Sequence, residues 1–389
     1  MTDLQILFIV LAALYGWECA CWAHRGSVAC RAWLGPRFKL AHPSRLLGNQ
    51  RGGFVFAHPL PPLGTLFLTT QFPVSISPEA VLAFVSPSLN PGSRPPQGGR
   101  LYPFDEILTI KAEAKRILIN GDMFVRAASS NLASHIANEL QQLKAIPASK
   151  RAKAIELMLH QTFDLQAIEQ RRAEFQNRTR SLRVITNGLF WYMFIAVPAV
   201  IWKLGLVPFW PVLLAVLLAG TTAIAVCFRR LHEHFFAALD DERFTYSLII
   251  LLSPATAIRA IDLLSRPLLE AYHPLAVAKI LCPEPGFRAL ASHYLREIRY
   301  PALPICPRPE SAAIEKEMRA LLQREVEGLL AKAGLDPEEL IRPPMPAESG
   351  CLSYCPRCLA QFTISAGACE DCGGIPLVPF AAKPASQKS

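Results

Sequence analysis

Two cysteine pairs near the end of the chain constrain its local folding more than any other feature. Cys355-Pro-Arg-Cys358 and Cys369-Glu-Asp-Cys372 are separated by ten residues. Zinc prefers four ligands in a tetrahedron, and a C-x-x-C turn brings two thiolate sulfurs together. The spacing therefore predicts a zinc ion bound by Cys355, Cys358, Cys369 and Cys372. Four protein ligands leave no position for water, so we expect this zinc to be structural.

The segment from Tyr354 to Phe380 resembles the zinc ribbon, or rubredoxin-like, family, and the four cysteines carry the resemblance. It implies two small hairpins with a ligand pair on each. A module of residues 351–380 is too small for much core, so metal binding would supply its folding energy. The alternatives are two disulfides or four unrelated thiols, and Cys351 lies just outside the pattern. The Pro-rich segment 342–350 predicts a mobile linker, and residues 381–389 form a tail.

Three apolar segments indicate an integral membrane protein, in a chain whose residues are 51% hydrophobic. The first, Leu4–Ala23, lies within a predicted anchor over 1–23. The others, Gly188–Ile201 and Leu206–Phe228, form a predicted helical hairpin over 186–228, because a membrane span needs roughly 20 apolar residues. The alternative for the first segment is a cleaved signal peptide, which the missing basic start disfavours.

Positive charges predict the orientation of these spans. Arginines and lysines follow the first span, precede the second and follow the third, whereas the hairpin turn carries only Lys203. By the positive-inside rule, the N-terminus and the turn face out, and the bulk and C-terminus are cytoplasmic. A thiolate zinc site fits that reducing compartment. Glu18 either lies at the interface or is a functional carboxylate inside the membrane.

The region before the hairpin is expected to combine strands with helices. A basic juxtamembrane segment covers 24–52 and a β-rich domain covers 53–145, with a hairpin at Asn120-Gly121 and a helix capped by Ser129 or Ser130. Strands closed by one helix over 53–144 resemble the pleckstrin-homology-like barrel, which implies peptide or lipid binding. A charged juxtamembrane helix, 146–185, leads into the hairpin.

The region after the hairpin, 229–341, is predicted to be helical. Ser253-Pro254 is typical of a helix start, with serine as the cap, and interrupts the apolar stretch Phe244–Ala257. Residues 311–332 show an apolar stripe at helical spacing, which predicts a core helix or a surface for a partner. The fold class is therefore an α+β membrane protein with three transmembrane helices, a β-rich domain, a helical region and a zinc ribbon.

No catalytic constellation is evident. The chain has no G-x-S-x-G, phosphate-loop or dinucleotide fingerprint. His232-Glu233-His234 lacks the spacing of a helical zinc site, because residues two apart diverge on a helix. Cys282 and Cys306 are more typical of core thiols than of nucleophiles.

These patterns favour a non-enzymatic, membrane-anchored scaffold or adaptor that binds a protein partner through the zinc ribbon and the amphipathic helix. One alternative is a membrane-tethered nucleic-acid binder, although the ribbon balances Arg357 against Glu370 and Asp371 and has no basic stripe. Another is a subunit of a membrane enzyme or transporter with a site near Glu18.

Overall fold

The computed structural model describes residues 3–21, 27–31, 40–42, 55–56, 65–69, 74–83, 100–127, 129–204, 208–237, 239–265, 267–282, 284–301, 309–372 and 374–380. The chain divides into two compact units, each built from three stretches of sequence. Unit 1 comprises Met1–Phe72, Leu108–Gln142 and Asp164–Gly286, and unit 2 comprises Pro73–Ile107, Leu143–Phe163 and Phe287–Ser389. Some expected features lie outside the described residues, among them Cys306 and the tail 381–389.

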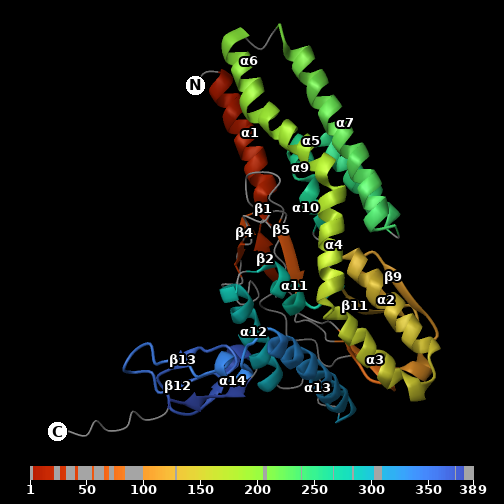
Figure 1. The fold of residues 1–389 in the computed structure, drawn as a ribbon, viewed down its shortest axis with the longest axis vertical. Helices are drawn as coiled ribbons and strands as arrows, with labels where there is room; N and C mark the ends of the chain where they lie inside the picture. Colours follow the sequence, from red (N-terminus) through yellow and green to blue (C-terminus); the bar gives the residue numbers. More distant parts are fainter. Residues whose placement is uncertain are drawn as a thin grey trace, which may run out of the picture. The chain divides into compact units, whose positions relative to one another are not determined.

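The helices of unit 1 are α1 (Asp3–Cys19), most of α2 (Ser130–Ala145), α4 (Leu165–Arg178), α5 (Arg180–Trp191), the π-helix η3 (Tyr192–Ala196), α6 (Val197–Leu204), α7 (Trp210–Phe235), α8 (Asp240–Leu252), α9 (Pro254–Ile258), α10 (Ala260–Ser265) and α11 (Pro274–Leu281). Helices α5, η3 and α6 form one arm of the long hairpin in Figure 1, and α7 forms the other. Asp164 caps α4 by accepting hydrogen bonds from the backbone N–H groups of Gln166 and Ala167.

Among the described residues, two helices are long and apolar enough to cross a membrane: Arg180–Leu204 and Trp210–Phe235. The prediction of three such helices is corrected to two. Helix α1 has only 17 residues because β1 (Ala20–Cys21) follows it directly and pairs with β4 (Val55–Phe56). At about 1.5 Å per residue, α1 is roughly 26 Å long, which falls short of a hydrocarbon layer of about 30 Å.

The hairpin is antiparallel, and three contacts set its register. Leu189 packs against Gly220, where an added Cβ would meet the leucine at 3.2 Å. Tyr192 donates its hydroxyl to the carbonyl of Leu213 at 2.6 Å. Near the other end, His234 Nε2 lies 2.6 Å from Glu174 Oε1. Counting residues between these contacts along the two antiparallel helices shows that Arg178 lies level with Arg230, and Arg180 with Arg229.

Helix α1 packs against the hairpin by aromatic contacts. The ring of Tyr15 lies 5.6 Å from that of Phe190 and 5.3 Å from that of Phe194. Helix α1 also contacts α6 and α9. Because Tyr15 is near the C-terminal end of α1 and α6 lies beyond Phe194, α1 runs antiparallel to α5 and α6.

The apolar stretch after α7 folds into α8, α9 and α10. Ser253 accepts a hydrogen bond from the N–H of Thr256, and Pro254 occupies the first turn, so the predicted cap is confirmed. Helix α9 contacts α1, α5 and α7. Arg259 and Asp262 form a buried ion pair at the junction of α9 and α10.

Unit 1 also holds small sheets. Strands β2 (Ser27–Arg31), β3 (Leu40–His42) and β5 (Thr65–Thr69) form one in the order β3-β2-β5, where the sequence predicted a basic segment followed by separate strands. Strands β9 (Ile110–Glu113), β10 (Arg116–Ile119) and β11 (Asp122–Arg126) form a meander in the order β11-β10-β9.

The turn between β10 and β11 confirms the predicted hairpin. Asn120 and Gly121 both have positive φ, 54° and 87°, as a type I′ turn requires. Ser129 then accepts a hydrogen bond from the N–H of Leu132, which confirms a serine cap for α2.

Unit 2 begins with a second meander, β6 (Val74–Ile76), β7 (Ala80–Ala83) and β8 (Arg100–Pro103), in that order, followed by the 3-10 turn η2 (Phe104–Glu106). The described strands of 53–144 thus belong to separate sheets assigned to different units, and not to the continuous ladder of a pleckstrin-homology-like barrel. The remaining helices of this unit are α3 (Ala148–Thr162), most of α12 (Glu284–Arg299), α13 (Pro309–Lys332) and α14 (Pro337–Leu340).

Helix α13 packs on the sheet of β6, β7 and β8, and its apolar stripe faces the interior of unit 2. Ile314 packs with Ala80 and Leu82, and Val326, Leu329 and Leu330 are buried. Helix α13 also contacts α3, with an ion pair between Arg324 and Glu156. The stripe predicted over 311–332 therefore belongs to a core helix in this structure.

Candidate metal centre

The four predicted cysteine ligands come together at one point of unit 2. The Sγ atoms of Cys355, Cys358, Cys369 and Cys372 all lie within 4.8 Å of one another. The sulfurs of Cys358 and Cys369 are 3.8 Å apart. A tetrahedron with Zn–S bonds of about 2.3 Å has edges of about 3.8 Å, so the donor set fits zinc. All four residues are free thiols.

Tight turns place each pair of sulfurs. In the first, the N–H of Cys355 donates to the carbonyl of Ala360 at 2.8 Å, and the N–H of Leu359 donates back to Cys355 at 2.9 Å. Leu359 has φ of 64°, the left-handed conformation that closes this turn. In the second, the N–H of Gly374 donates to the carbonyl of Cys369 at 2.9 Å, and glycine accommodates its φ of 88°.

Short strands support the two turns. Strands β12 (Ser353–Tyr354), β13 (Gln361–Phe362) and β16 (Val378–Pro379) form a sheet in the order β13-β12-β16. Strands β14 (Ala368–Cys369) and β15 (Ile375–Pro376) form a separate pair, and η4 (Glu370–Cys372) carries the last ligand. Cys355 and Cys369 are buried with Ile375 and Leu377, so the ligands themselves form much of the core of the module.

Crowding and burial govern the ionisation of these thiols. Burial raises the pKa of Cys358 to about 11, and burial together with the neighbouring thiols raises that of Cys372. Burial opposes ionisation of Cys355 as well, but hydrogen bonds from the backbone N–H groups of Cys358 and Arg357 give a net lowering of its pKa. Four adjacent sulfurs cannot all carry negative charge without a cation, which a bound zinc would supply.

A buried arginine attaches the module to α12. Arg296 is only 6% exposed, and its guanidinium donates to the carbonyls of Pro356 at 3.3 Å and Arg342 at 3.2 Å. It also donates to Ser292 and Leu340. Tyr300, the first residue after α12, packs against the cysteine core.

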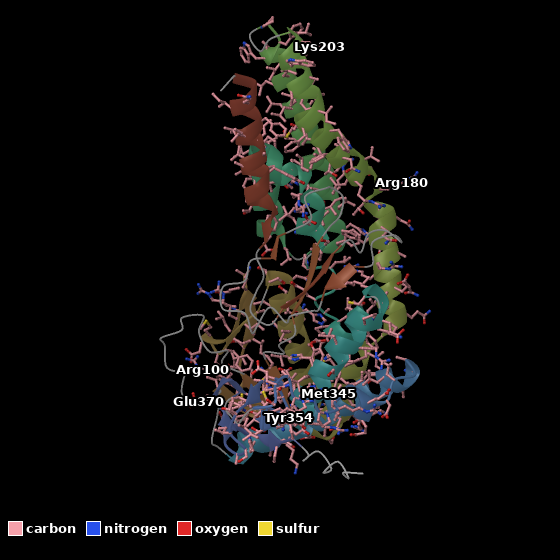
Figure 2. All side chains as sticks on the ribbon, turned by 90° about the vertical axis from the view of Figure 1, so that its left-hand side faces the viewer. Arg100, Arg180, Lys203, Met345, Tyr354 and Glu370 are labelled. Carbon is pink, nitrogen blue, oxygen red and sulfur yellow. The ribbon has the colours of Figure 1, made fainter. Side chains whose placement is uncertain are left out.

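The Pro-rich segment 342–350, predicted as a mobile linker, makes hydrogen bonds to the module. The side-chain amide of Gln361 donates to the carbonyl of Met345 at 2.9 Å and accepts from the N–H of Ala347 at 2.7 Å. Arg357 forms an ion pair with Glu297 at 3.1 Å. Figure 2 labels Met345, Tyr354 and Glu370 in this part of the chain.

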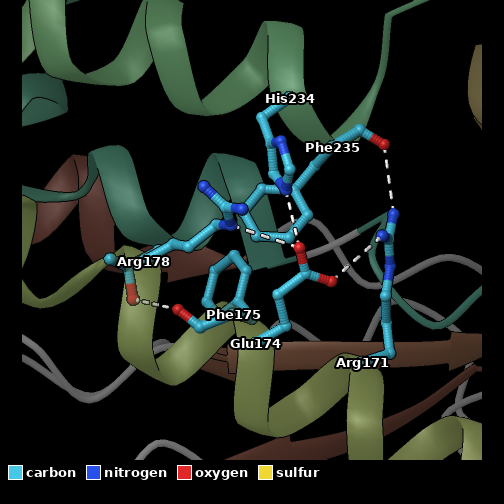
Figure 3. Close-up of polar contacts among 7 residues, drawn as sticks. Arg171, Glu174, Phe175, Arg178, His234 and Phe235 are labelled. Atoms are coloured by element: carbon cyan, nitrogen blue, oxygen red, sulfur yellow. Dashed lines mark hydrogen bonds and ion pairs between the residues drawn. The ribbon is translucent and has the colours of Figure 1, made fainter.

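The histidines and glutamate of 232–234 contact separate partners. His232 is buried and its ring lies 5.6 Å from that of Phe228. Glu233 pairs with Arg243 at 3.4 Å. His234 instead contacts Glu174, which also faces Arg171 and Arg178 (Figure 3). Hydrogen bonding to His234 is the main reason why the pKa of Glu174 is lowered.

Among the described residues, no other residue singled out by sequence belongs to the four-cysteine group. Cys282 is buried, and the sulfur of Cys351 is not among the four clustered ligand atoms. Glu18 falls within α1, but its side chain lies outside the described residues, as does Cys306. Arg296 was missed, because a lone arginine on a helix gives no sequence signal that its guanidinium will be buried.

Comparison with protein-family models, with curated proteins and with solved structures finds no match to this chain. The four clustered cysteines and the two apolar helices are therefore the features from which a function can be argued.

Proposed function

We propose that this protein is an integral membrane protein that acts by binding and not by catalysis, and that its zinc module presents a docking face to a protein partner on the cytoplasmic side. The observation that carries the proposal is the four-cysteine group, whose sulfurs lie close enough to complete a tetrahedral zinc shell and whose module is attached to α12 by buried Arg296. A filled shell favours a structural zinc that shapes a surface.

The surface of the hairpin supports the membrane assignment. Large apolar side chains point away from the rest of the protein along both helices: Val184, Trp191, Ile195, Trp202, Leu204, Trp210, Val212, Leu214, Val216, Leu218 and Val226. A soluble protein rarely exposes an apolar area of this extent. From Arg183 to Lys203 the chain rises about 30 Å, which matches a hydrocarbon layer.

The charges at the two ends of the hairpin support the orientation. Arg178, Arg180, Arg229 and Arg230 are exposed at one level, and Lys203 stands at the other end (Figure 2 labels Arg180 and Lys203). The positive-inside rule favours a cytoplasmic location for the four arginines. The thiols of the zinc module would then lie in the reducing compartment.

The docking face we propose is formed by exposed apolar side chains on the zinc module. Leu352 and Ile364 are about half exposed; Leu352 directly precedes β12, and Ile364 follows β13, the strand that pairs with β12. Nucleic acid is less favoured as the partner, because Arg357 is already paired with Glu297.

Site-specific photo-crosslinking in intact cells tests this proposal. A benzoylphenylalanine at Ile364 should yield a discrete adduct with a second protein, and the adduct should disappear in Cys369→Ser. The matched control is Leu157, an equally exposed apolar residue on α3 of the same unit, which should yield none. An adduct that survives Cys369→Ser, or the absence of any protein adduct at Ile364, would reject the docking face.

A further inference from the structure

Helix α8 has its apolar residues on the outside, unlike a helix of a soluble protein. Phe244, Leu248, Ile249, Leu251 and Leu252 are exposed, and Leu252 is 73% exposed. Their spacing follows one face of a helix.

The opposite face of α8 turns several more polar side chains towards the protein, while Thr245 is exposed beside the apolar residues. Arg243, Tyr246 and Ser247 are half-buried, and Ile250 is fully buried among them. Ser247 donates its hydroxyl to the carbonyl of Arg243 within the helix. This inverted pattern is expected where the surroundings are hydrocarbon and not water.

The position of α8 along α7 follows from three contacts. Arg243 pairs with Glu233 at 3.4 Å, and the ring of Tyr246 lies 6.5 Å from that of His232 and 6.2 Å from that of Phe228. Helix α8 therefore runs antiparallel to α7, back towards the apolar part of the hairpin.

The C-terminal end of α8 lies beyond the level of the four exposed arginines at the base of the hairpin, on the side of its turn. From Arg243 to Leu252 the helix rises about 14 Å, whereas Arg229 stands only about 6 Å above Glu233 on α7. Leu252 is thus about 8 Å beyond Arg229, in the direction of the exposed apolar side chains of α7, which we call the apolar belt.

Helix α1 ends before it reaches the level of the arginines, and the distance that it leaves is close to the distance by which α8 extends beyond that level. Its last residue, Cys19, lies about 6 Å beyond Tyr15, while Arg180 lies about 15 Å beyond Phe190, which Tyr15 contacts. Helix α1 therefore ends about 9 Å before the level of the arginines. Helix α9, which follows Leu252 and Ser253, contacts α1, α5 and α7.

We propose that α8 and α9 form a re-entrant segment, which enters the cytoplasmic leaflet beneath the short helix α1 and whose outer face contacts lipid acyl chains. The proposal rests on the membrane assignment of the hairpin made above. Two observations support acyl chains as the partner of this outer face. The exposed apolar face of α8 continues the apolar belt of α7. The residues at the C-terminal end of α8 lie beyond the exposed arginines, whose charges suit lipid headgroups.

Photo-crosslinking of the full chain in phosphatidylcholine–phosphatidylglycerol vesicles with alkyne-tagged acyl chains tests this inference. Benzoylphenylalanine at Leu252 should give a lipid adduct at several-fold the yield seen at Leu108. Leu108 is the matched control because it is 77% exposed in unit 1 and lies next to β9, outside the hairpin segment. A probe at Leu248, one turn lower on the same face, should also give the adduct.

A third probe, at Val216 on the exposed face of α7, separates this proposal from the one on which it rests. Lipid adducts at Val216, Leu248 and Leu252 but not at Leu108 are the expected result. An adduct at Val216 alone would overturn the re-entrant segment and leave the hairpin in the membrane. A protein adduct at Leu252 between two copies of the chain would overturn it as well. No adduct at any position would reject the membrane hairpin itself.

Discussion

Arg296→Ala removes the guanidinium that attaches the zinc module to α12. The carbonyls of Pro356 and Arg342 lose their hydrogen bonds from this side chain, whereas the carbonyl of Leu340 still accepts a bond from Ser292 at 2.7 Å. A hydrogen bond from a charged donor contributes about 1.5–3 kcal/mol. Because both bonds are longer than 3.1 Å, we use the lower part of that range for each and expect a loss of about 3–4 kcal/mol in the free energy of local opening.

Hydrogen–deuterium exchange measured by mass spectrometry on the purified full chain reports this opening. A loss of about 3–4 kcal/mol corresponds to roughly 150- to 1,000-fold faster exchange in peptides covering 342–380. The zinc content should stay unchanged, because the four ligands do not depend on Arg296.

Arg299→Ala on the same helix is the matched control. Its ion pair with Glu338 is solvent-exposed, and such a pair contributes about 0–1 kcal/mol, so exchange should change by less than about fivefold. Unchanged exchange in Arg296→Ala, or a loss as large in Arg299→Ala, would refute the idea that the buried arginine attaches the module.

Cys369→Ser should abolish zinc binding and make 351–380 sensitive to limited proteolysis, while the hairpin stays protected; a stably folded module without metal would contradict a structural role. Glu174→Gln should remove part of the acid sensitivity of thermal unfolding. Hydrogen bonding to His234 lowers the pKa of Glu174 below its ordinary value of 4.5. The ionised carboxylate therefore stabilises the folded protein above pH 4.5, and this stabilisation is lost as the pH falls below that value. Identical profiles of melting temperature against pH for variant and wild type would count against that contact. Gly121→Ala should lower the free energy of unfolding by about 1 kcal/mol, because the turn between β10 and β11 holds this residue at a φ of 87°. Gly188→Ala, where an added Cβ meets open space, should leave the free energy of unfolding in urea titrations nearly unchanged.

The features that the sequence predicted correctly are local ones. The C-x-x-C pairs, Asn120-Gly121 and Ser253-Pro254 each fix a turn or a cap within a few residues, so their geometry can be inferred without the rest of the fold. The candidate metal centre was predictable for the same reason, because ligand type and spacing are written in one short segment.

The features that could not be predicted depend on contacts between distant residues. The early end of α1 depends on the pairing of Ala20 and Cys21 with strand β4, more than thirty residues later. The separation of the strands of 53–144 depends on which helices cover each sheet, such as α13 over β6 and β7. The attachment of the module by Arg296 joins residues about sixty positions apart, and no periodic pattern records it.

Metal analysis of the protein extracted from membranes tests the central claim most directly. We predict one zinc ion per chain in the wild type and none in Cys369→Ser, with both proteins in the membrane fraction. Wild-type protein without zinc, or a variant that keeps it, would contradict the claim that the four cysteines form a zinc centre in a membrane protein.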